Sequence, residues 1–315
     1  MFEKIEKEKQ NRIHGRVILG LVVSVLISTA AVRGESSRNL WNVTLFGGGS
    51  FGQNGDAGIF IQAYDRYYRS WADAYGYTKT GSLNWPGAGL VFGGEIGYSL
   101  SSRLGVGLAV ERLAKKEEGS FSLGSGDSHA MEVMLSAMSV SASGRYAVPL
   151  TKAGAIFFRV RLGAIFGSLA RTLDRQEPAA PRPLLQVEAD YSATGLAGQA
   201  GLGLEWELTP QLSLQIEGGY RIASLPKWSG NATYQNTWGT DTVTERASGH
   251  LYYEETQWDT ERIPTIYHPS LTLGTPEGHV WTIRRDFKAD FTGFCCQLGF
   301  TFRFGRSAKS PSGTP

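Results

Sequence analysis

Residues 293–304 read GFCCQLGFTFRF, and this stretch decides the fold class. Every second residue in it is apolar: Phe294, Cys296, Leu298, Phe300, Phe302 and Phe304. The residues between them are small or polar and include Arg303. Because successive side chains of a pleated strand point to opposite faces, the pattern predicts a strand with one apolar and one polar face.

Seven further segments repeat this period of two. They lie at residues 41–49, 90–98, 104–111, 138–146, 156–166, 196–208 and 212–222, and the first is the least regular. Their apolar faces carry no charge, and their opposite faces carry Glu and Arg but no Lys. The charged residues of the eight polar faces are Glu95, Glu111, Arg145, Arg159, Arg161, Glu205, Glu207, Glu217, Arg221 and Arg303.

This distribution is the inverse of that in a soluble β-protein, which exposes its polar face and scatters Lys with Arg over it. Arg suits desolvated, two-pronged pairing with carboxylates, and the interspersed Gly suits a narrow interior. We therefore predict an all-β fold, a closed antiparallel eight-stranded transmembrane β-barrel with lipid outside. Because a barrel of this size is just wide enough for its side chains to fill, the ten charges are predicted to form an ion-pair network in the lumen.

The connections support the same topology. Four are long, at residues 51–86, 113–130, 170–190 and 224–289, and they alternate with short turns at 99–103, 147–153 and 208–211. Transmembrane barrels have short periplasmic turns and longer extracellular loops. Within the last loop, 251–256 and 271–283 are candidates for an extra hairpin, so ten strands remain an alternative.

The N-terminus has the organisation of a signal peptide. Five Lys/Arg precede an apolar run, residues 17–32, that at 16 residues is shorter than the roughly 18–20 a membrane-spanning helix needs. We predict a signal peptide over 1–34, with a single-helix anchor as the alternative, a barrel over 35–304 and a disordered tail over 305–315.

Overall composition excludes several classes. A mean hydropathy of −0.20 excludes a polytopic helical membrane protein. Residues 1–31 hold five of the 31 Lys/Arg and three of the 29 Asp/Glu, so the chain without them is formally neutral. No basic field is present to recruit nucleic acid.

In these features the chain resembles the small eight-stranded outer-membrane barrels of Gram-negative bacteria, of the OmpA-transmembrane-domain, OmpX and OmpW type. The resemblance rests on the signal peptide, the eight alternating segments, the loop asymmetry and the aromatic final strand. It implies an outer-membrane location, contact with outer-membrane lipids and lipopolysaccharide, and recognition by the barrel-assembly machinery. Unlike the usual family member, this chain continues past Phe304.

The first and fourth loops hold the candidate binding residues. Six of the eight Trp lie there: Trp71, Trp85, Trp228, Trp238, Trp258 and Trp281. Aromatic side chains above a membrane predict binding of a glycan or protein ligand, and the alternative is that they pack against one another. Aromatic residues at helical spacing also predict a helix over 59–75.

The sequence gives little indication of a catalytic site or a bound cofactor. His129, His250, His268 and His279 lie in or beside the predicted loops, but no triad signature surrounds them. Cys295 and Cys296 are adjacent and point to opposite faces, and the GxGxxG of residues 47–52 lacks a βαβ context. We predict no catalytic residues, no metal and no cofactor, and a binding or envelope-structural role; a narrow pore and a loop-sited lipid or peptide hydrolase are the alternatives.

Overall fold

The computed structural model describes residues 41–52, 55–83, 87–176, 185–238, 241–258, 261–267 and 280–304. The predicted signal peptide and the predicted C-terminal tail lie outside the described residues.

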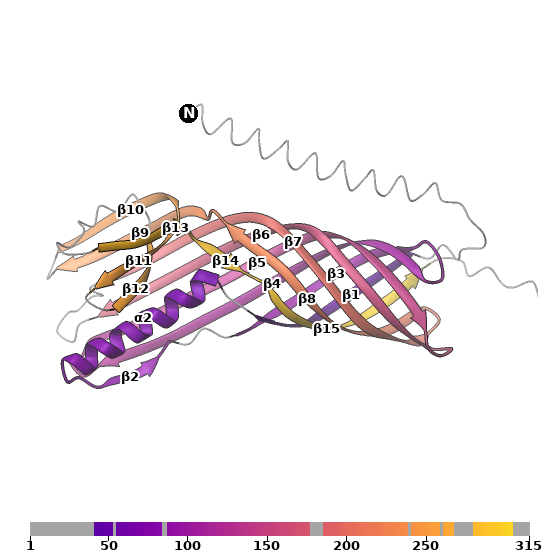
Figure 1. Ribbon diagram of the computed structural model, residues 1–315, viewed down its shortest axis with the longest axis horizontal. Helices are drawn as coiled ribbons and strands as arrows, with labels where there is room; N and C mark the ends of the chain where they lie inside the picture. Colours follow the sequence, from indigo (N-terminus) through magenta and orange to yellow (C-terminus); the bar gives the residue numbers. More distant parts are fainter. Residues whose placement is uncertain are drawn as a thin grey trace, which may run out of the picture.

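Eight strands form a closed antiparallel ring (Figure 1). They are β1 (Trp41–Gly52), β3 (Ala88–Ser99), β4 (Leu104–Leu123), β5 (Ser128–Pro149), β6 (Gly154–Gln176), β7 (Leu185–Thr209), β8 (Leu212–Pro226) and β15 (Gly293–Phe304). Each strand pairs with the next, and β15 closes the ring by pairing with both β8 and β1. The predicted eight-stranded barrel is therefore confirmed, and its ring has no unpaired edge to expose to lipid.

The two ends of the barrel differ. At one end the strands are joined by residues 100–103, 150–153 and 210–211. The other end carries the remaining elements: α2 (Gly55–Ala74), β2 (Lys79–Ser82), β9 (Ser229–Trp238), β10 (Asp241–His250), β11 (Tyr252–Trp258), β12 (Glu261–Tyr267), β13 (Val280–Asp286) and β14 (Lys288–Asp290) (Figure 1). With the topology of outer-membrane barrels, the end with short turns is periplasmic and the other is extracellular.

The extracellular elements extend the barrel without widening its ring. β9 and β10 continue the sheet from β7, and β14 pairs with the end of β8. β11, β12 and β13 form a separate three-stranded sheet, in which β11 pairs with β13. Of the two segments considered for an extra hairpin, the first thus pairs with the described end of the second, from Val280 on, but outside the ring, which keeps eight strands among the described residues.

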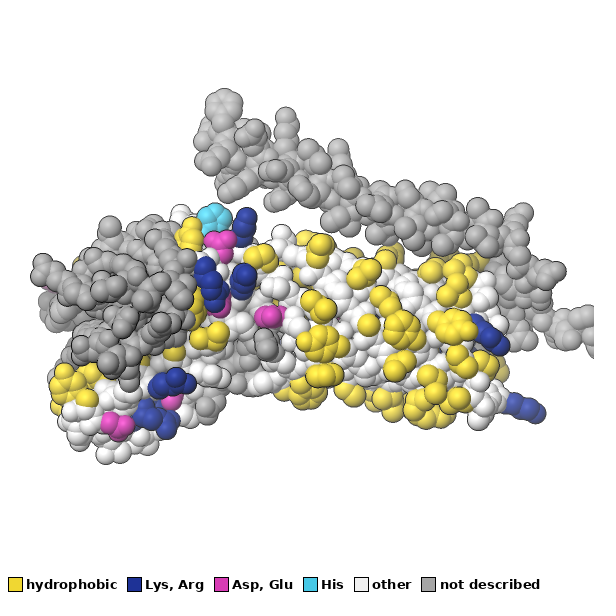
Figure 2. All heavy atoms as spheres, in the orientation of Figure 1, with side chains coloured by type: hydrophobic (Ala, Val, Ile, Leu, Met, Phe, Trp, Pro, Cys, Tyr) yellow, Lys and Arg dark blue, Asp and Glu magenta, His cyan; other side chains and the backbone are white. Residues whose placement is uncertain are grey.

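An apolar belt surrounds the periplasmic half of the barrel. Large hydrophobic side chains gather there on the outer surface, and charged side chains gather over the extracellular half (Figure 2). Exposed fractions reach 78% for Leu196, 68% for Phe294 and 65% for Leu162. No helix in the described part of the chain is long and apolar enough to cross a membrane.

The two faces of the long strands exchange polarity partway along. On β6, outward residues 156–166 are apolar, and from Ser168 to Asp174 they are small or polar. Inward, the buried Arg159 and Arg161 give way to the equally buried Leu169 and Leu173. The strand therefore crosses from a region with lipid outside to one with water outside, and we call these the membrane half and the extracellular half.

This reversal corrects two predicted loops. Most of 113–130 and of 170–190 is strand, because β4 continues to Leu123, β5 begins at Ser128, β6 continues to Gln176 and β7 begins at Leu185. In the extracellular half the apolar residues occupy the inward positions. A strand prediction that requires apolar residues at the outward positions therefore ends each of these strands too early.

Candidate functional site

The centre of the lumen holds four interlocked charges. Arg159 on β6 lies 2.5 Å from Glu217 on β8 and 3.8 Å from Glu95 on β3. Arg161, two residues on, lies 3.4 Å from Glu95 and 3.5 Å from Glu217. All four side chains are buried. Each guanidinium therefore contacts both carboxylates, as desolvated charges require.

A second pair lies deeper towards the extracellular half. The buried Arg221 on β8 binds Glu111 on β4 at 2.6 Å. Amide side chains add two hydrogen bonds: Gln199 accepts from Arg221 at 3.1 Å, and Gln297 donates to Glu111 at 3.0 Å. The charges are thus embedded in a hydrogen-bonded network, which offsets part of their desolvation cost.

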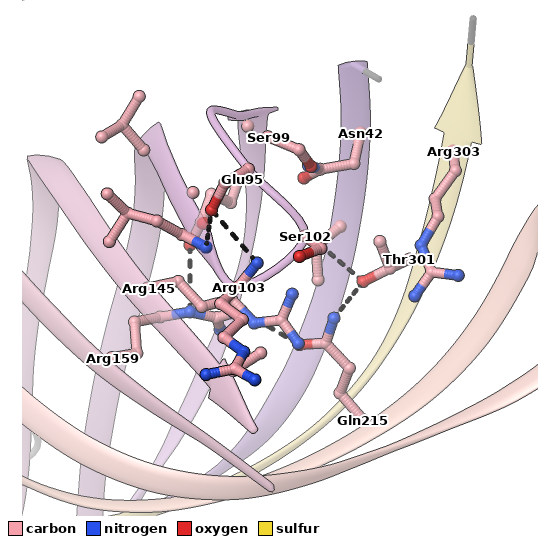
Figure 3. A pocket seen from close by; sticks show the side chains of 17 residues that line it. Asn42, Glu95, Ser99, Ser102, Arg103, Arg145, Arg159, Gln215, Thr301 and Arg303 are labelled. Atoms are coloured by element: carbon pink, nitrogen blue, oxygen red, sulfur yellow. Dashed lines mark hydrogen bonds and ion pairs between the residues drawn. The ribbon is translucent and has the colours of Figure 1, made fainter. Parts of the chain in front are cut away.

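A third group sits at the periplasmic mouth. Arg145 and Arg303 share Glu205, with Arg303 at 2.6 Å, and Arg303 also lies 3.7 Å from Glu207. Above it a cavity of about 60 Å³ opens beside the turn at residues 100–103. Arg303 reaches this cavity from β15 (Figure 3). The space suits a few water molecules rather than a continuous channel.

The structure brings all ten predicted lumen residues into ion pairs. Two aromatic neighbours were missed from the sequence. The buried Phe157 lies beneath the guanidinium groups of Arg145 and Arg159, at 4.7 and 4.9 Å, and Phe46 lies 5.0 Å from that of Arg161. Their inward positions break the rule that apolar residues face lipid, so period-two reading could not place them.

Above this lumen network, apolar side chains fill the extracellular half. We call α2, β2, β9, β10 and β14, with the extracellular parts of β4–β7, the extracellular cap. Its core combines Phe60 and Ile61 of α2 with inward residues of the barrel wall, such as Leu135, and with Trp228. The cap is therefore packed like the core of a soluble domain, and α2 packs against inward residues of the barrel wall on the extracellular side of the ion pairs.

Two buried aspartates fix α2 in place. Asp56 in its first turn accepts two hydrogen bonds from Arg285, both 2.6 Å, and one from the Lys288 amide at 2.7 Å. Asp65 binds Lys79 Nζ at 2.7 Å and accepts from the Leu83 amide at 2.8 Å. The hydrogen bond and charge of Lys79 hold the pKa of Asp65 below its usual value despite burial. The first loop is thereby tied to the fourth.

The end of α2 positions an aromatic group at the extracellular tip. Gly76 has a φ of +70°, and its amide and that of Tyr77 donate to Asp73 and Ala72, as in a Schellman motif. This turn places Tyr77 in a stack on Trp71, with ring centroids 5.6 Å apart and planes 28° apart. A left-handed residue is needed here, and Gly adopts it without strain.

Tyr75 completes this group, which we call the aromatic platform: Trp71, Tyr75 and Tyr77. Tyr75 packs on Trp71 at 4.9 Å and is 66% exposed, and Tyr77 is also exposed. Trp71 itself is half-buried and packs against the core of the cap. The platform therefore consists of a tryptophan held by the core of the cap and two tyrosines exposed to solvent.

The other five tryptophans that were predicted to bind a ligand are either buried or outside what the structure describes. Trp228 is fully buried and donates its indole N–H to the Leu225 carbonyl at 2.7 Å. It is a core residue and presents no surface to a ligand, which corrects that prediction. Trp85 lies outside the described residues, and the side chains of Trp238, Trp258 and Trp281 also lie outside what the structure describes.

His129 is placed for packing rather than catalysis. It is buried between Phe121, stacked at 4.6 Å, and Tyr64, whose hydroxyl is 3.1 Å from Nδ1. Its sequence neighbour Asp127 instead lies 3.8 Å from Arg175. No acid–histidine pair forms there. His250 is exposed, and His268 and His279 lie outside the described residues.

Burial of His129 predicts a pH-dependent cap. Desolvation, with the nearby charges of Arg175 and Lys79, lowers the pKa of His129 from 6.5 to about 4. The unfolded cap takes up this proton near pH 6.5 and the folded cap only near pH 4. Stability present above pH 6.5 is therefore lost as the pH falls towards 4.

Hydrogen exchange of α2 at pH 7 and pH 4.5 measures this loss. His129→Phe fits the aromatic surroundings and should remove the part of the pH dependence that His129 causes. The matched control is the exposed His250→Phe, which should behave as the wild type. Equal pH dependence in all three proteins would contradict the assignment.

The closed ring, its apolar belt and its filled lumen define an outer-membrane-type transmembrane β-barrel. The sequence matches the family model of the outer membrane protein beta-barrel domain over residues 18–243, more than half of the chain, and the chain belongs to this family. The expectation of a small outer-membrane barrel is confirmed, and the protein resides in the outer membrane of a Gram-negative bacterium.

Two other comparisons add no functional information. No curated protein matches the sequence significantly. Among solved structures, the outer membrane protease OmpT from Escherichia coli is similar at 9% identity and a TM-score of 0.28, over 87% of this chain and 99% of that chain. We draw no inference about activity from a likeness at that level.

Proposed function

We propose that this protein is a non-conducting outer-membrane barrel that acts through its extracellular cap as a binding protein at the cell surface. The observation that carries the proposal is that the lumen is filled at two levels. Ion pairs of the lumen network occupy the membrane half, and α2 with the apolar core of the cap occupies the extracellular half. A filled interior favours a role for the surface above it over a role in transport.

Conductance separates this function from a narrow pore. The full-length protein, reconstituted in planar bilayers, should show no unitary conductance. A matched positive control deletes α2 and truncates the side chains of Arg159 and Glu217 in the same variant. These changes remove part of the filling from both the extracellular half and the membrane half. Regular unitary steps from the wild-type protein would contradict the proposed function and favour the pore.

The aromatic platform supports the binding role. Exposed tyrosines anchored on a packed tryptophan offer contact area at a low cost in conformational entropy. On glycan and peptide arrays, Tyr75→Ala/Tyr77→Ala should lose binding that the wild type shows. The control Trp41→Ala removes an exposed aromatic side chain at the periplasmic end of β1 and should bind as the wild type. Equal binding by the platform variant would contradict the assignment of the site to this surface.

A further inference from the structure

One charged side chain of the cap stands in an apolar wall. Arg171 on β6 occupies an inward position between Leu169 and Leu173. Its direct neighbours on the adjacent strands are Val133 of β5 and Ala189 of β7. All four of these neighbours are buried. Arg171 itself is half-buried, so part of its side chain reaches solvent.

Arg171 has no counter-charge among the described residues. No hydrogen bond or ion pair joins it to any of them, and its Nε is enclosed without a partner. Three aspartates of the cap are engaged elsewhere: Asp56 with Arg285, Asp65 with Lys79 and Asp127 with Arg175. A partly desolvated guanidinium without an acid is costly, and proteins rarely keep one without a use.

The surroundings of Arg171 are aromatic. Its guanidinium lies 5.1 Å from the centroid of the Phe60 ring. Burial raises the pKa of the hydroxyl groups of Tyr64, Tyr191 and Tyr234, and the positive charge of Arg171 opposes this rise in all three. A cation–π contact accounts for the orientation of the guanidinium but gives its N–H donors no hydrogen-bond acceptor among the described residues.

We propose that Arg171 is an anion-binding residue of the extracellular cap, taking a carboxylate or phosphate group of a small extracellular ligand. The guanidinium donors match the geometry of such oxyanions, and the aromatic rings provide faces for the rest of the ligand. This inference rests on the proposed binding role of the cap and names the chemistry of one ligand group. The site is distinct from the aromatic platform, since it uses inward residues of the barrel wall.

Thermal unfolding of the full-length protein in detergent tests the proposal with three matched sugars. Glucuronate carries a carboxylate, glucose 6-phosphate carries a phosphate, and glucose carries neither. At millimolar concentrations, at least one charged sugar should raise the unfolding midpoint of the wild type with a saturating dependence, and glucose should not. The response of each sugar shows which oxyanion is preferred.

Two variants place the effect at Arg171. Arg171→Met keeps the length of the side chain without its charge and should lose the response, whereas Arg171→Lys keeps the charge and should weaken it. The control Arg66→Met removes an exposed arginine of α2 and should respond as the wild type.

Two results would overturn the proposal: no response of the wild type to either charged sugar, or an unchanged response in Arg171→Met. Either would leave the non-conducting barrel intact. Conversely, conductance by the wild type would overturn the proposed function without altering the response at Arg171.

Discussion

Replacing Glu217 by glutamine should lower the free energy of unfolding by about 3–5 kcal/mol, because it leaves two buried guanidinium groups with one carboxylate. Glu217 lies 2.5 Å from Arg159 and 3.5 Å from Arg161, and all three side chains are buried. The substitution keeps the size of the side chain, so the loss reports the charge. Equilibrium unfolding in urea, from lipid vesicles, measures it.

The control for this prediction is an ion pair outside the barrel. Glu132 lies 3.2 Å from Lys116, and both side chains are well exposed. Glu132→Gln should leave stability unchanged within error, because exposed pairs are solvated in either state. Similar losses in the two variants would mean that the lumen is hydrated, and the filled-lumen account would fail.

Leu162→Arg should cost about 2–4 kcal/mol of stability in lipid, because its side chain faces the hydrocarbon near the middle of the belt. Leu162 is among the most exposed apolar residues of the barrel. The same change in a soluble protein, at a position this exposed, would be nearly neutral. Urea unfolding in lipid vesicles measures the difference in unfolding free energy between this variant and the wild type.

A matched control lies on the same face of the same strand. Thr172 is ten residues beyond Leu162 on β6 and points outward in the extracellular half. Its cross-strand neighbours are Glu132 and Glu188, so Thr172→Arg should leave stability unchanged or raise it slightly. Equal losses at the two positions would contradict the assignment of lipid and water to the two halves.

The membrane half could be predicted from the sequence because one rule holds throughout it. Lipid outside and a narrow interior force every strand into the same alternation, so residues such as Leu214 and Glu217 could be assigned to faces one strand at a time. This assignment of residues to faces did not require knowing which strands pair with each other. The ten charges of the lumen network were placed by this rule alone, and the structure brings them into ion pairs.

The cap could not be predicted in the same way. Above the membrane the rule reverses, so Leu169 and Leu173 face inward where Phe166 had faced lipid. Trp228 became a core residue through contacts with distant parts of the chain, such as Gly167, where an added Cβ would meet its ring at 2.7 Å. Such contacts depend on the assembled barrel, and spacing along one segment does not contain them.

The reversal of polarity along β6 is the central claim, and site-directed spin labelling tests it most directly. In a Cys295→Ala/Cys296→Ala background, labels at the even positions from 156 to 174 report whether oxygen or a water-soluble nickel complex reaches them in lipid. The account predicts high oxygen accessibility from 156 to 166 and a change to high nickel accessibility from 168 onward. Uniform accessibility along the strand, or nickel access at 158–164, would contradict it.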